Sequence, residues 1–193
     1  METLEKAIMT LGKGIGDRIV KVDMFLNHRL ETGLIFEMGK ELAGEFADEK
    51  PDLILTVEAS GIALAMAAAH AMNDIPVVFA KKSKTDVQND ETVQAPVYSF
   101  THRQMNMIRV EKKYLPANSR VLIVDDFLAD GQAANGMINL CEQCGCTVVG
   151  IGIGIEKGFQ PGGKLLREKG VHLRSLAIVE SIQDGEIVLR RQD

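Results

Sequence analysis

One stretch, residues 121–134, limits the possible folds of this chain more than any other. Its sequence, V-L-I-V-D-D-F-L-A-D-G-Q-A-A, has four apolar residues, two aspartates, a Gly-containing turn and an Ala-rich segment typical of a helix. The apolar run predicts a buried parallel strand, because a strand covered on both faces needs no polar alternation. We expect the strand to bring Asp125 and Asp126 to its carboxyl end, where open α/β sheets bind ligands.

The two halves of this stretch suit different parts of one ligand. Backbone N–H groups at a helix start can bind phosphate. The carboxylates can accept hydrogen bonds from sugar hydroxyls or coordinate Mg²⁺, which prefers oxygen ligands. A phosphorylated ribose would satisfy both, although apolar strands ending in Asp-Asp also occur in response regulators, phosphatases and simple Rossmann-like sheets.

The size and charge of the chain exclude other classes. A length of 193 residues predicts one α/β domain. The apolar runs are strand-sized, so we expect no membrane span. The acidic start, M-E-T-L-E-K, lacks the basic region of a signal peptide and predicts a cytoplasmic protein. A net charge of −5 argues against a general nucleic-acid surface.

Three cysteines, Cys141, Cys144 and Cys146, raise the question of a metal or redox site. The sequence has no fourth ligand nearby, and the cluster falls where a helix should turn through Gly145 into a strand. We therefore favour packing thiols.

Strand and helix patterns alternate along the middle of the chain, which predicts a mainly parallel sheet covered on both faces. We expect that the terminal segments do not continue this alternation. The polar residues 82–94 fit an ordinary surface loop, but their position beside two lysines also suits a lid. We expect strands at 53–57, 76–80, 121–124 and 148–155, and helices at about 34–46, 62–72 and 132–144.

Together these motifs resemble the type I phosphoribosyltransferases. The signature of that family has four hydrophobic residues, two acids, two hydrophobic residues and a small Gly-bearing loop, the order found at 121–131. The resemblance extends over nearly the whole chain to the bacterial members that act on xanthine. The further motifs are K-V-D-M-F-L-N-H at 21–28, E-A-S-G-I-A at 58–63, P-V-V-F-A-K-K at 76–82 and I-E-K-G-F-Q-P-G at 155–162.

The resemblance implies the type I phosphoribosyltransferase fold, a mainly parallel Rossmann-like sheet flanked by helices. It implies a single domain, residues 1–193, with a core of about 33–157 and a small hood of about 1–32 and 158–193. It favours a mobile hood loop at 82–94, flanked by strands at 97–100 and 105–110, and it implies a homodimer.

The implied activity is transfer of the 5-phosphoribosyl group from phosphoribosyl pyrophosphate (PRPP) to xanthine in purine salvage. Guanine or hypoxanthine are alternative bases. A regulator that senses purines or PRPP is another class, but an acidic 193-residue chain has no basic recognition helix for DNA. Mg²⁺ is expected to be held mostly by substrate and water oxygens, so no protein residue is assigned as a metal ligand.

The resemblance also assigns site residues. Asp125 and Asp126 would be the catalytic carboxylates beside the ribose. The 5-phosphate would bind the loop of Ala129, Asp130, Gly131, Gln132 and Ala133. The pyrophosphate would bind Glu58, Ala59, Ser60, Gly61, Lys81 and Lys82, with one lysine supplied by a neighbouring subunit in dimeric members. The base would bind Val20, Asn27, Phe127 and Lys157.

The chemistry of the base residues agrees with a 6-oxopurine. Lys157 can only donate, so it suits a 6-oxo group and not a 6-amino group. Asn27 can donate to a 2-oxo group, while Val20 packs on the ring and Phe127 stacks. Taken alone, however, Asn27 fits a helix cap equally well.

Several other assignments stay open from residue type alone. Ser60 fits an N-cap as well as a ligand contact, and Lys81 and Lys82 fit solvated charges. Ala133 stands where the family commonly has Ser or Thr, and Asp130 where a neutral polar residue is usual. Because a carboxylate repels phosphate, we expect Asp130 to point outward or to be neutralised by a neighbour.

Overall fold

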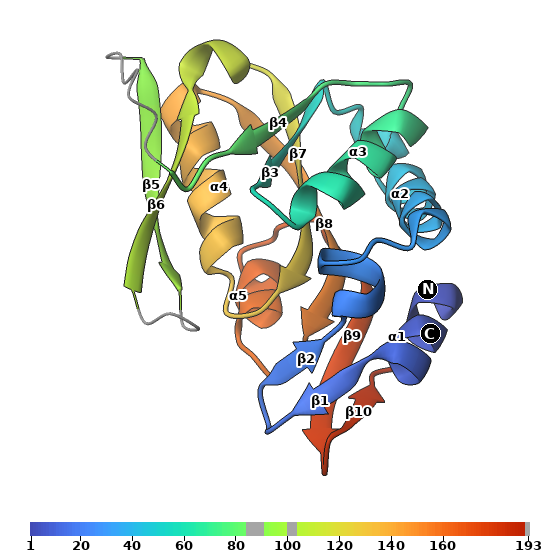
Figure 1. Ribbon diagram of the computed structural model, residues 1–193. Helices are drawn as coiled ribbons and strands as arrows, with labels where there is room; N and C mark the ends of the chain where they lie inside the picture. Colours follow the sequence, from blue (N-terminus) through green and yellow to red (C-terminus); the bar gives the residue numbers. More distant parts are fainter. Residues whose placement is uncertain (84–90, 100–103, 192–193) are drawn as a thin grey trace.

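A computed structural model describes residues 1–83, 91–99 and 104–191 of the chain. Its centre is a six-stranded sheet with strand order β10-β9-β8-β7-β3-β4 (Figure 1). The five strands from β9 to β4 run parallel, and β10 pairs antiparallel with β9. The strands are β3 (Leu53–Val57), β4 (Val77–Ala80), β7 (Arg120–Leu128), β8 (Thr147–Lys157), β9 (Leu173–Gln183) and β10 (Glu186–Leu189).

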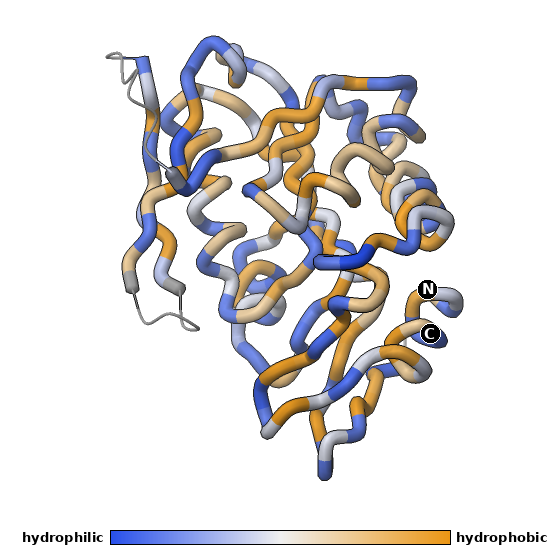
Figure 2. Tube along the Cα trace, viewed as in Figure 1, coloured by the Kyte–Doolittle hydropathy of each residue, from blue (hydrophilic) through white to orange (hydrophobic). Residues whose placement is uncertain are grey.

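Helices cover both faces of this sheet, and each layer buries its own apolar core. On one face lie α2 (Thr32–Glu45) and α3 (Gly61–Ala71). On the other lie α4 (Gln132–Cys144), α5 (Gly162–Glu168) and an antiparallel hairpin of β5 (Thr92–Ser99) and β6 (Gln104–Glu111). The central strands are mostly hydrophobic (Figure 2), which is the composition of strands buried on both faces.

The N-terminal segment packs against the C-terminal strands at one end of the sheet. It contains α1 (Glu2–Leu11), a hairpin of β1 (Lys13–Ile15) and β2 (Ile19–Lys21), and the π-helical turn η1 (Asp23–Asn27). The Gly14 N–H donates to the Gly185 carbonyl at 3.1 Å, joining the two ends of the chain. The division into a core and a hood stays a prediction. Two 3-10 turns, η2 (Ala47–Glu49) and η3 (Lys112–Tyr114), complete the described elements.

The predicted fold class, a mainly parallel α/β sheet flanked by helices, is confirmed. The expectation that the terminal segments leave the βα alternation is wrong for the C-terminal one, because β8, α5 and β9 form a further βα unit with β9 parallel to β8. The strand predicted at 121–124 runs on to Leu128, so Asp125 and Asp126 lie within β7. Pairing of Phe127 with Ile155 in β8 carries the strand past the two acids.

The predicted loop at 82–94 is only partly described. Its last three residues, 92–94, belong to β5, and residues 84–90 lie outside the described residues. The strands predicted at 97–100 and 105–110 correspond to parts of β5 and β6, except that residue 100 is not described. Whether the loop acts as a lid stays a prediction.

The cysteines lie at the end of α4 and before β8. All three are free, and burial raises the pKa of the Cys141 thiol to about 12. A thiol with that pKa stays protonated at neutral pH. The surroundings of the cysteines therefore agree with a packing role.

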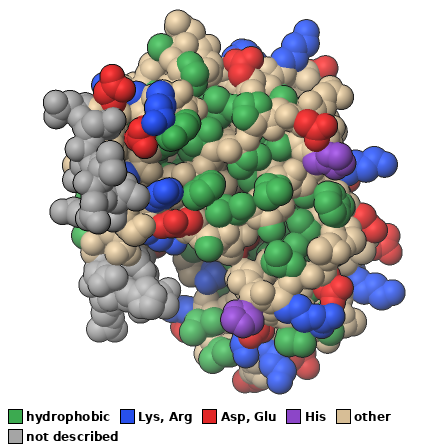
Figure 3. All heavy atoms as spheres, turned by 45° about the horizontal axis from the view of Figure 1, so that its top comes forward, with side chains coloured by type: hydrophobic (Ala, Val, Ile, Leu, Met, Phe, Trp, Pro, Cys, Tyr) green, Lys and Arg blue, Asp and Glu red, His purple; other side chains and the backbone are tan. Residues whose placement is uncertain are grey.

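Two surface properties concern possible partners. No helix in the described part of the chain is long and apolar enough to cross a membrane. Large apolar side chains nevertheless gather on one face of the molecule (Figure 3). Around α2, α3 and β4 these include Leu30, Phe36, Met66 and Phe79, which are 44%, 55%, 61% and 41% exposed. We call these four residues the apolar face.

Candidate active site

The two aspartates of β7 are the buried charges at the centre of the site. Asp125 and Asp126 are each 6% exposed. Burial raises the pKa of Asp125 well above its usual range, and the adjacent charge of Asp126 raises it further, while the charge of Lys82 opposes the shift. Two carboxylates in one desolvated place repel each other, so this arrangement costs stability and is of the kind found at functional sites.

The strand-to-helix turn after β3 lies directly against Asp125. The turn consists of Glu58, Ala59, Ser60 and Gly61, and its Glu58–Ala59 peptide bond is cis. A Cβ atom on Gly61 would stand 2.6 Å from Asp125 Oδ1 and 2.4 Å from Thr56 Oγ1. Only glycine therefore fits here without displacing its neighbours, and the turn and the acid pair form one unit.

Substituting Gly61 tests this close approach. We expect Gly61→Ala to lower the free energy of unfolding by about 1–3 kcal/mol, because an added methyl group overpacks the site. Urea denaturation measures the change. Gly33→Ala is the matched control, since a Cβ on Gly33 of α2 meets nothing within 4 Å. If both variants are as stable as the parent, the contact between Gly61 and Asp125 is not present in solution.

Two residues of this turn differ in their hydrogen bonds. Ser60 occupies the N-cap position of α3, yet within the described residues its side chain makes no capping hydrogen bond. Glu58 Oε1 accepts hydrogen bonds from the backbone N–H groups of Lys82, at 2.5 Å, and Ser83, at 3.3 Å. The charge of Lys82 thus reaches the acid pair, whereas Lys81 is exposed and pairs with Arg109 through its backbone.

The predicted phosphate loop forms the start of α4. Gly131 is the N-cap residue with φ 87° and ψ 8°, a left-handed conformation that favours glycine. Ala129, Asp130, Gln132 and Ala133 are half-buried around it. Asp130 Oδ1 accepts a hydrogen bond from the Gln132 N–H at 3.2 Å. The other N–H groups of this helix start suit an anion.

The end of β8 brings Lys157 to the same edge of the sheet. Lys157 Nζ lies 5.7 Å from the centroid of the Phe127 ring and donates to the Arg18 carbonyl at 3.1 Å. Burial lowers the pKa of Lys157, and the charge of Asp130 partly offsets this. Asp130 is thus close enough to a cation to be partly neutralised, as its position in the loop requires.

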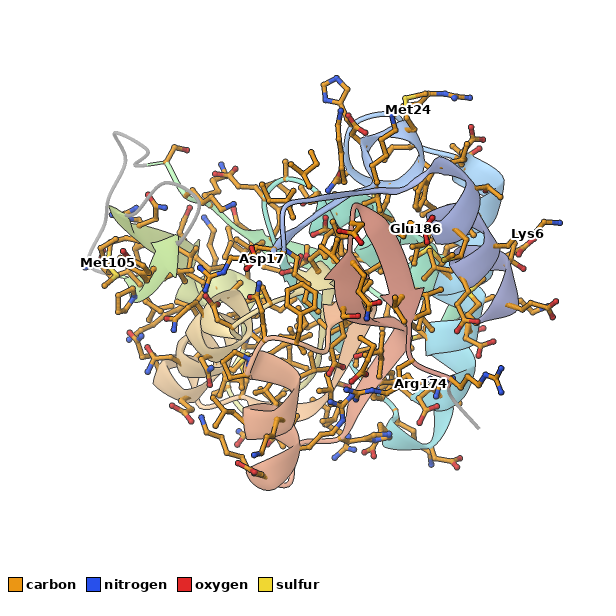
Figure 4. The ribbon with its side chains drawn as sticks, turned by 90° about the horizontal axis from the view of Figure 1, so that it is seen from below. Lys6, Asp17, Met24, Met105, Arg174 and Glu186 are labelled. Atoms are coloured by element: carbon orange, nitrogen blue, oxygen red, sulfur yellow. The ribbon has the colours of Figure 1, made fainter. Side chains whose placement is uncertain are left out.

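The hairpin of β1 and β2 covers this edge. Figure 4 shows Asp17, in the hairpin turn, near the middle of the molecule as seen from below, whereas Lys6 and Met105 lie at opposite sides. Val20 of β2 is buried, in the apolar cluster against which Phe127 packs. The hairpin therefore brings Arg18 and Val20 to the place predicted for a base.

Asn27 links this place to the acid pair. It ends η1, and its Nδ2 lies 3.5 Å from Asp126 Oδ2, a long hydrogen bond in which the amide donates. Because the carboxylate accepts, the amide presents its N–H₂ group, and not its oxygen, toward Asp126. A second N–H of that group remains to donate elsewhere.

Most of the predicted residues thus meet at one edge of the sheet, with Lys81 the least connected of them. Four further residues were not predicted. Arg18 contributes a backbone carbonyl, which has no sequence signal. Thr56 is fully buried, and its hydroxyl has no partner among the described residues. Glu156 and Gly162 stand in the quoted motif at 155–162, but no role was assigned to them.

The site offers two buried carboxylates for metal binding. The described residues contain no group of three or more His, Cys, Asp or Glu side chains that could hold a metal ion. The carboxylate oxygens of Asp125 and Asp126 are hard donors that suit Mg²⁺, with the other positions filled by oxygens of a phosphorylated ligand and water.

The chain is similar in sequence and in structure to known proteins. A model of the phosphoribosyl transferase domain matches residues 21–182. The curated xanthine phosphoribosyltransferase of Ruminiclostridium cellulolyticum is 48% identical over 187 residues, which cover 97% of this chain and 98% of the relative. That of Clostridioides difficile is 45% identical over 190 residues, covering 98% and 100%.

Solved structures of adenine phosphoribosyltransferases have the same fold. The protein from Thermoanaerobacter pseudethanolicus has a TM-score of 0.66 and 25% identity, and the match covers 77% of this chain and 81% of that one. The protein from Rhodothermus marinus has a TM-score of 0.72 and 22% identity, with 93% and 100% covered.

Proposed function

The chain belongs to the phosphoribosyl transferase family, and from this premise we propose that it transfers the 5-phosphoribosyl group of PRPP to xanthine. The products are xanthosine 5-monophosphate and pyrophosphate, so the protein is a glycosyltransferase of purine salvage. Its three free cysteines suit the reducing cytoplasm. One observation carries the proposal: the buried acid pair lies on β7, which leads into the start of α4, and Asp126 accepts a hydrogen bond from Asn27, while Lys157 lies over Phe127 of the same strand.

The reaction joins a base nitrogen to C1 of the ribose while the bond from C1 to the pyrophosphate oxygen breaks. The electron pair of that bond leaves with pyrophosphate, and the proton that the base nitrogen loses passes to pyrophosphate or to water. Positive charge grows on C1 and the ring oxygen as the leaving group departs. Buried carboxylates beside C1 stabilise this charge, because their negative charges are fixed before the reaction and little water screens them. We assign this work to Asp125 and Asp126.

The two anionic ends of PRPP have separate subsites in this proposal. The N–H groups at the start of α4 bind the 5-phosphate, where Gly131 lets the backbone approach closely. The turn from Glu58 to Gly61 binds the pyrophosphate with Lys81 and Lys82. Mg²⁺, when bound, neutralises charge on the diphosphate and so makes it a better leaving group.

The base subsite selects xanthine by the donors that it offers. Lys157 donates to the 6-oxo group with an N–H other than the one that it donates to the Arg18 carbonyl. The second N–H of the Asn27 amide donates to the 2-oxo group, which hypoxanthine lacks. Both residues can donate at neutral pH, so a base with oxygens at both positions satisfies them.

Product analysis tests the proposed reaction. The protein is incubated with PRPP, Mg²⁺ and xanthine, and xanthosine 5-monophosphate and pyrophosphate are measured separately. We expect equal amounts of the two products. Ribose 5-phosphate in place of PRPP is the control, because it has no leaving group and should give neither product. Absence of both products with PRPP would contradict the proposal. If products form only with guanine or hypoxanthine, that base and not xanthine is the substrate.

We further propose that the apolar face forms a homodimer. It borders an open groove of about 740 Å³ lined by α2 and α3. Burial of Phe36 and Met66 would stabilise a dimer by removing their apolar surface from water. A second copy of the chain is the proposed occupant, because an interface between identical chains presents the same patch on both sides. Such a dimer would allow a lysine of one subunit to reach the pyrophosphate of the other.

A charge in the apolar face tests the dimer. We expect the double variant Phe36→Glu/Met66→Glu to be a monomer, because it would bury four like charges across a twofold interface. Sedimentation equilibrium measures the mass. Met9→Glu is the control, since Met9 is 57% exposed on α1, outside the apolar face. A parent protein that sediments at 21.1 kDa would contradict the proposed dimer.

A further inference from the structure

An ion pair between the buried carboxylate of Glu156 and the partly exposed Arg167 lies behind the phosphate loop and has no part in the reaction described above. Glu156, at the end of β8, is 2% exposed. Its two oxygens accept hydrogen bonds from Arg167 Nη1 at 2.8 Å and Nη2 at 2.7 Å. Ser175 Oγ donates to Oε2 at 2.5 Å. Burial alone would raise the pKa of Glu156, but these hydrogen bonds lower it below its usual value. The pair therefore ties α5 firmly to β8 and β9.

The first two residues of α5 connect this ion pair to the phosphate loop. A Cβ on Gly163 would lie 2.0 Å from Glu156 Oε1, so the helix backbone rests on the carboxylate. A Cβ on Gly162 would lie 2.5 Å from the Ala129 carbonyl and 2.6 Å from the Gly131 nitrogen. The Gly162 N–H also donates to the Ala129 carbonyl at 3.1 Å. The start of α5 is thus packed between the carboxylate and the loop.

A second connection joins α5 to α4. Lys169, the C-cap residue of α5, donates to Asn135 Oδ1 at 3.1 Å. The Asn135 amide in turn donates to the Gly131 carbonyl at 2.8 Å. Both ends of α5 therefore contact residues that fix the loop, while Lys157, the neighbour of Glu156, contacts the base subsite through Phe127 and Arg18.

We propose that Glu156 is a positioning residue that holds the loop of Ala129–Gly131 in its phosphate-binding geometry through Arg167 and α5. The inference rests on the proposed function, since it assigns to this loop the 5-phosphate of PRPP. Backbone N–H groups bind an anion well only when they are fixed in advance, and a shift of about 1 Å in such a site can cost about a hundredfold. Glu156 therefore sets the affinity for the phosphate end of the substrate and leaves the affinity for the base unchanged.

Two variants that act from opposite sides of α5 test the inference. Glu156→Gln keeps the shape but loses the charge that holds Arg167, and Gly162→Ala pushes a methyl group against the loop with the ion pair intact. For both we expect the KM for PRPP to rise by about tenfold or more, with the KM for xanthine within about twofold of the parent. Lys164→Ala is the matched control on the same helix, because Lys164 is 78% exposed and its ion pair with Glu168 spans 3.8 Å.

Ribose 5-phosphate separates this inference from the proposed function. Calorimetry measures the binding of ribose 5-phosphate without any base or turnover. A parent protein without transferase activity would refute the proposed reaction, but phosphate binding by the loop could still be measured in this way. We expect weaker binding of ribose 5-phosphate by both variants. If Glu156→Gln does not fold, Arg167→Gln, which removes the exposed partner of the same carboxylate, decides the outcome by the same measurements. Unchanged PRPP and ribose 5-phosphate affinities, or equal rises in KM for PRPP and xanthine, would overturn the positioning role.

Discussion

Replacement of either aspartate of β7 by asparagine should lower kcat by about a hundredfold, because each carboxylate stabilises the positive charge that grows at C1. One fixed electrostatic contact in a catalytic site is typically worth about 3 kcal/mol. Asparagine has almost the same shape, and its oxygen can still accept the hydrogen bond that Asp125 Oδ1 takes from the Asp126 N–H at 2.9 Å. Steady-state kinetics with saturating PRPP and xanthine measures the loss.

Stability should change in the opposite direction for Asp125→Asn. Burial and the charge of Asp126 raise the pKa of Asp125 above its ordinary value of 3.8. The native state then holds this proton more tightly than the unfolded state, so stability falls as pH rises from about 3.8 through the folded pKa. Above that window Asp125→Asn should be at least as stable as the parent. Asp184→Asn is the control, because Asp184 is exposed in a turn with φ 51°, which asparagine tolerates.

Near-normal kcat in both Asp125→Asn and Asp126→Asn would refute the catalytic role of the pair.

Lys157→Met should lower kcat/KM for xanthine, guanine and hypoxanthine together, since all three bases carry the 6-oxo group. A buried acceptor left without its donor costs about 1–3 kcal/mol, which is about 5- to 150-fold in kcat/KM. Methionine keeps the apolar length of lysine beside Phe127, so the loss should reflect the missing donor. Lys164→Met, on the surface of α5, is the control and should leave all three bases unaffected.

Asn27→Ala should have a different signature. The substitution should lower transition-state stabilisation by about 1–3 kcal/mol for xanthine. For hypoxanthine, which has no 2-oxo group, the loss should be much smaller. The ratio of the two kcat/KM values isolates this effect, because losses in PRPP binding are common to both bases. An unchanged ratio would mean that Asn27 only supports the structure through its contact with Asp126.

The helix at 132–144 illustrates what sequence patterns determine. Its predicted and observed bounds agree because glycines with positive φ stand at both ends, Gly131 at 87° and Gly145 at 71°. The apolar run from Val121 likewise predicted the central strand, although that strand continues past the acid pair to Leu128. Local signals of this kind suffice where a residue type has few alternatives.

The C-terminal βα unit could not be predicted in the same way. The helix α5 has seven residues and begins with two glycines, which are poor helix formers. Those glycines are required by the carboxylate of Glu156 on one side and the loop carbonyl of Ala129 on the other. Both contacts join residues distant in sequence. The donation from Lys157 to the Arg18 carbonyl is also tertiary, so no local pattern indicates it.

The most direct test of the proposed function is the kcat/KM of the parent protein for xanthine, guanine, hypoxanthine and adenine at one saturating PRPP concentration with Mg²⁺. Donors at Lys157 and Asn27 predict that xanthine has the highest value and adenine the lowest. Guanine and hypoxanthine should lie between them, because they have the 6-oxo group without the 2-oxo group. A value for guanine or hypoxanthine equal to or above that for xanthine would contradict the assigned substrate.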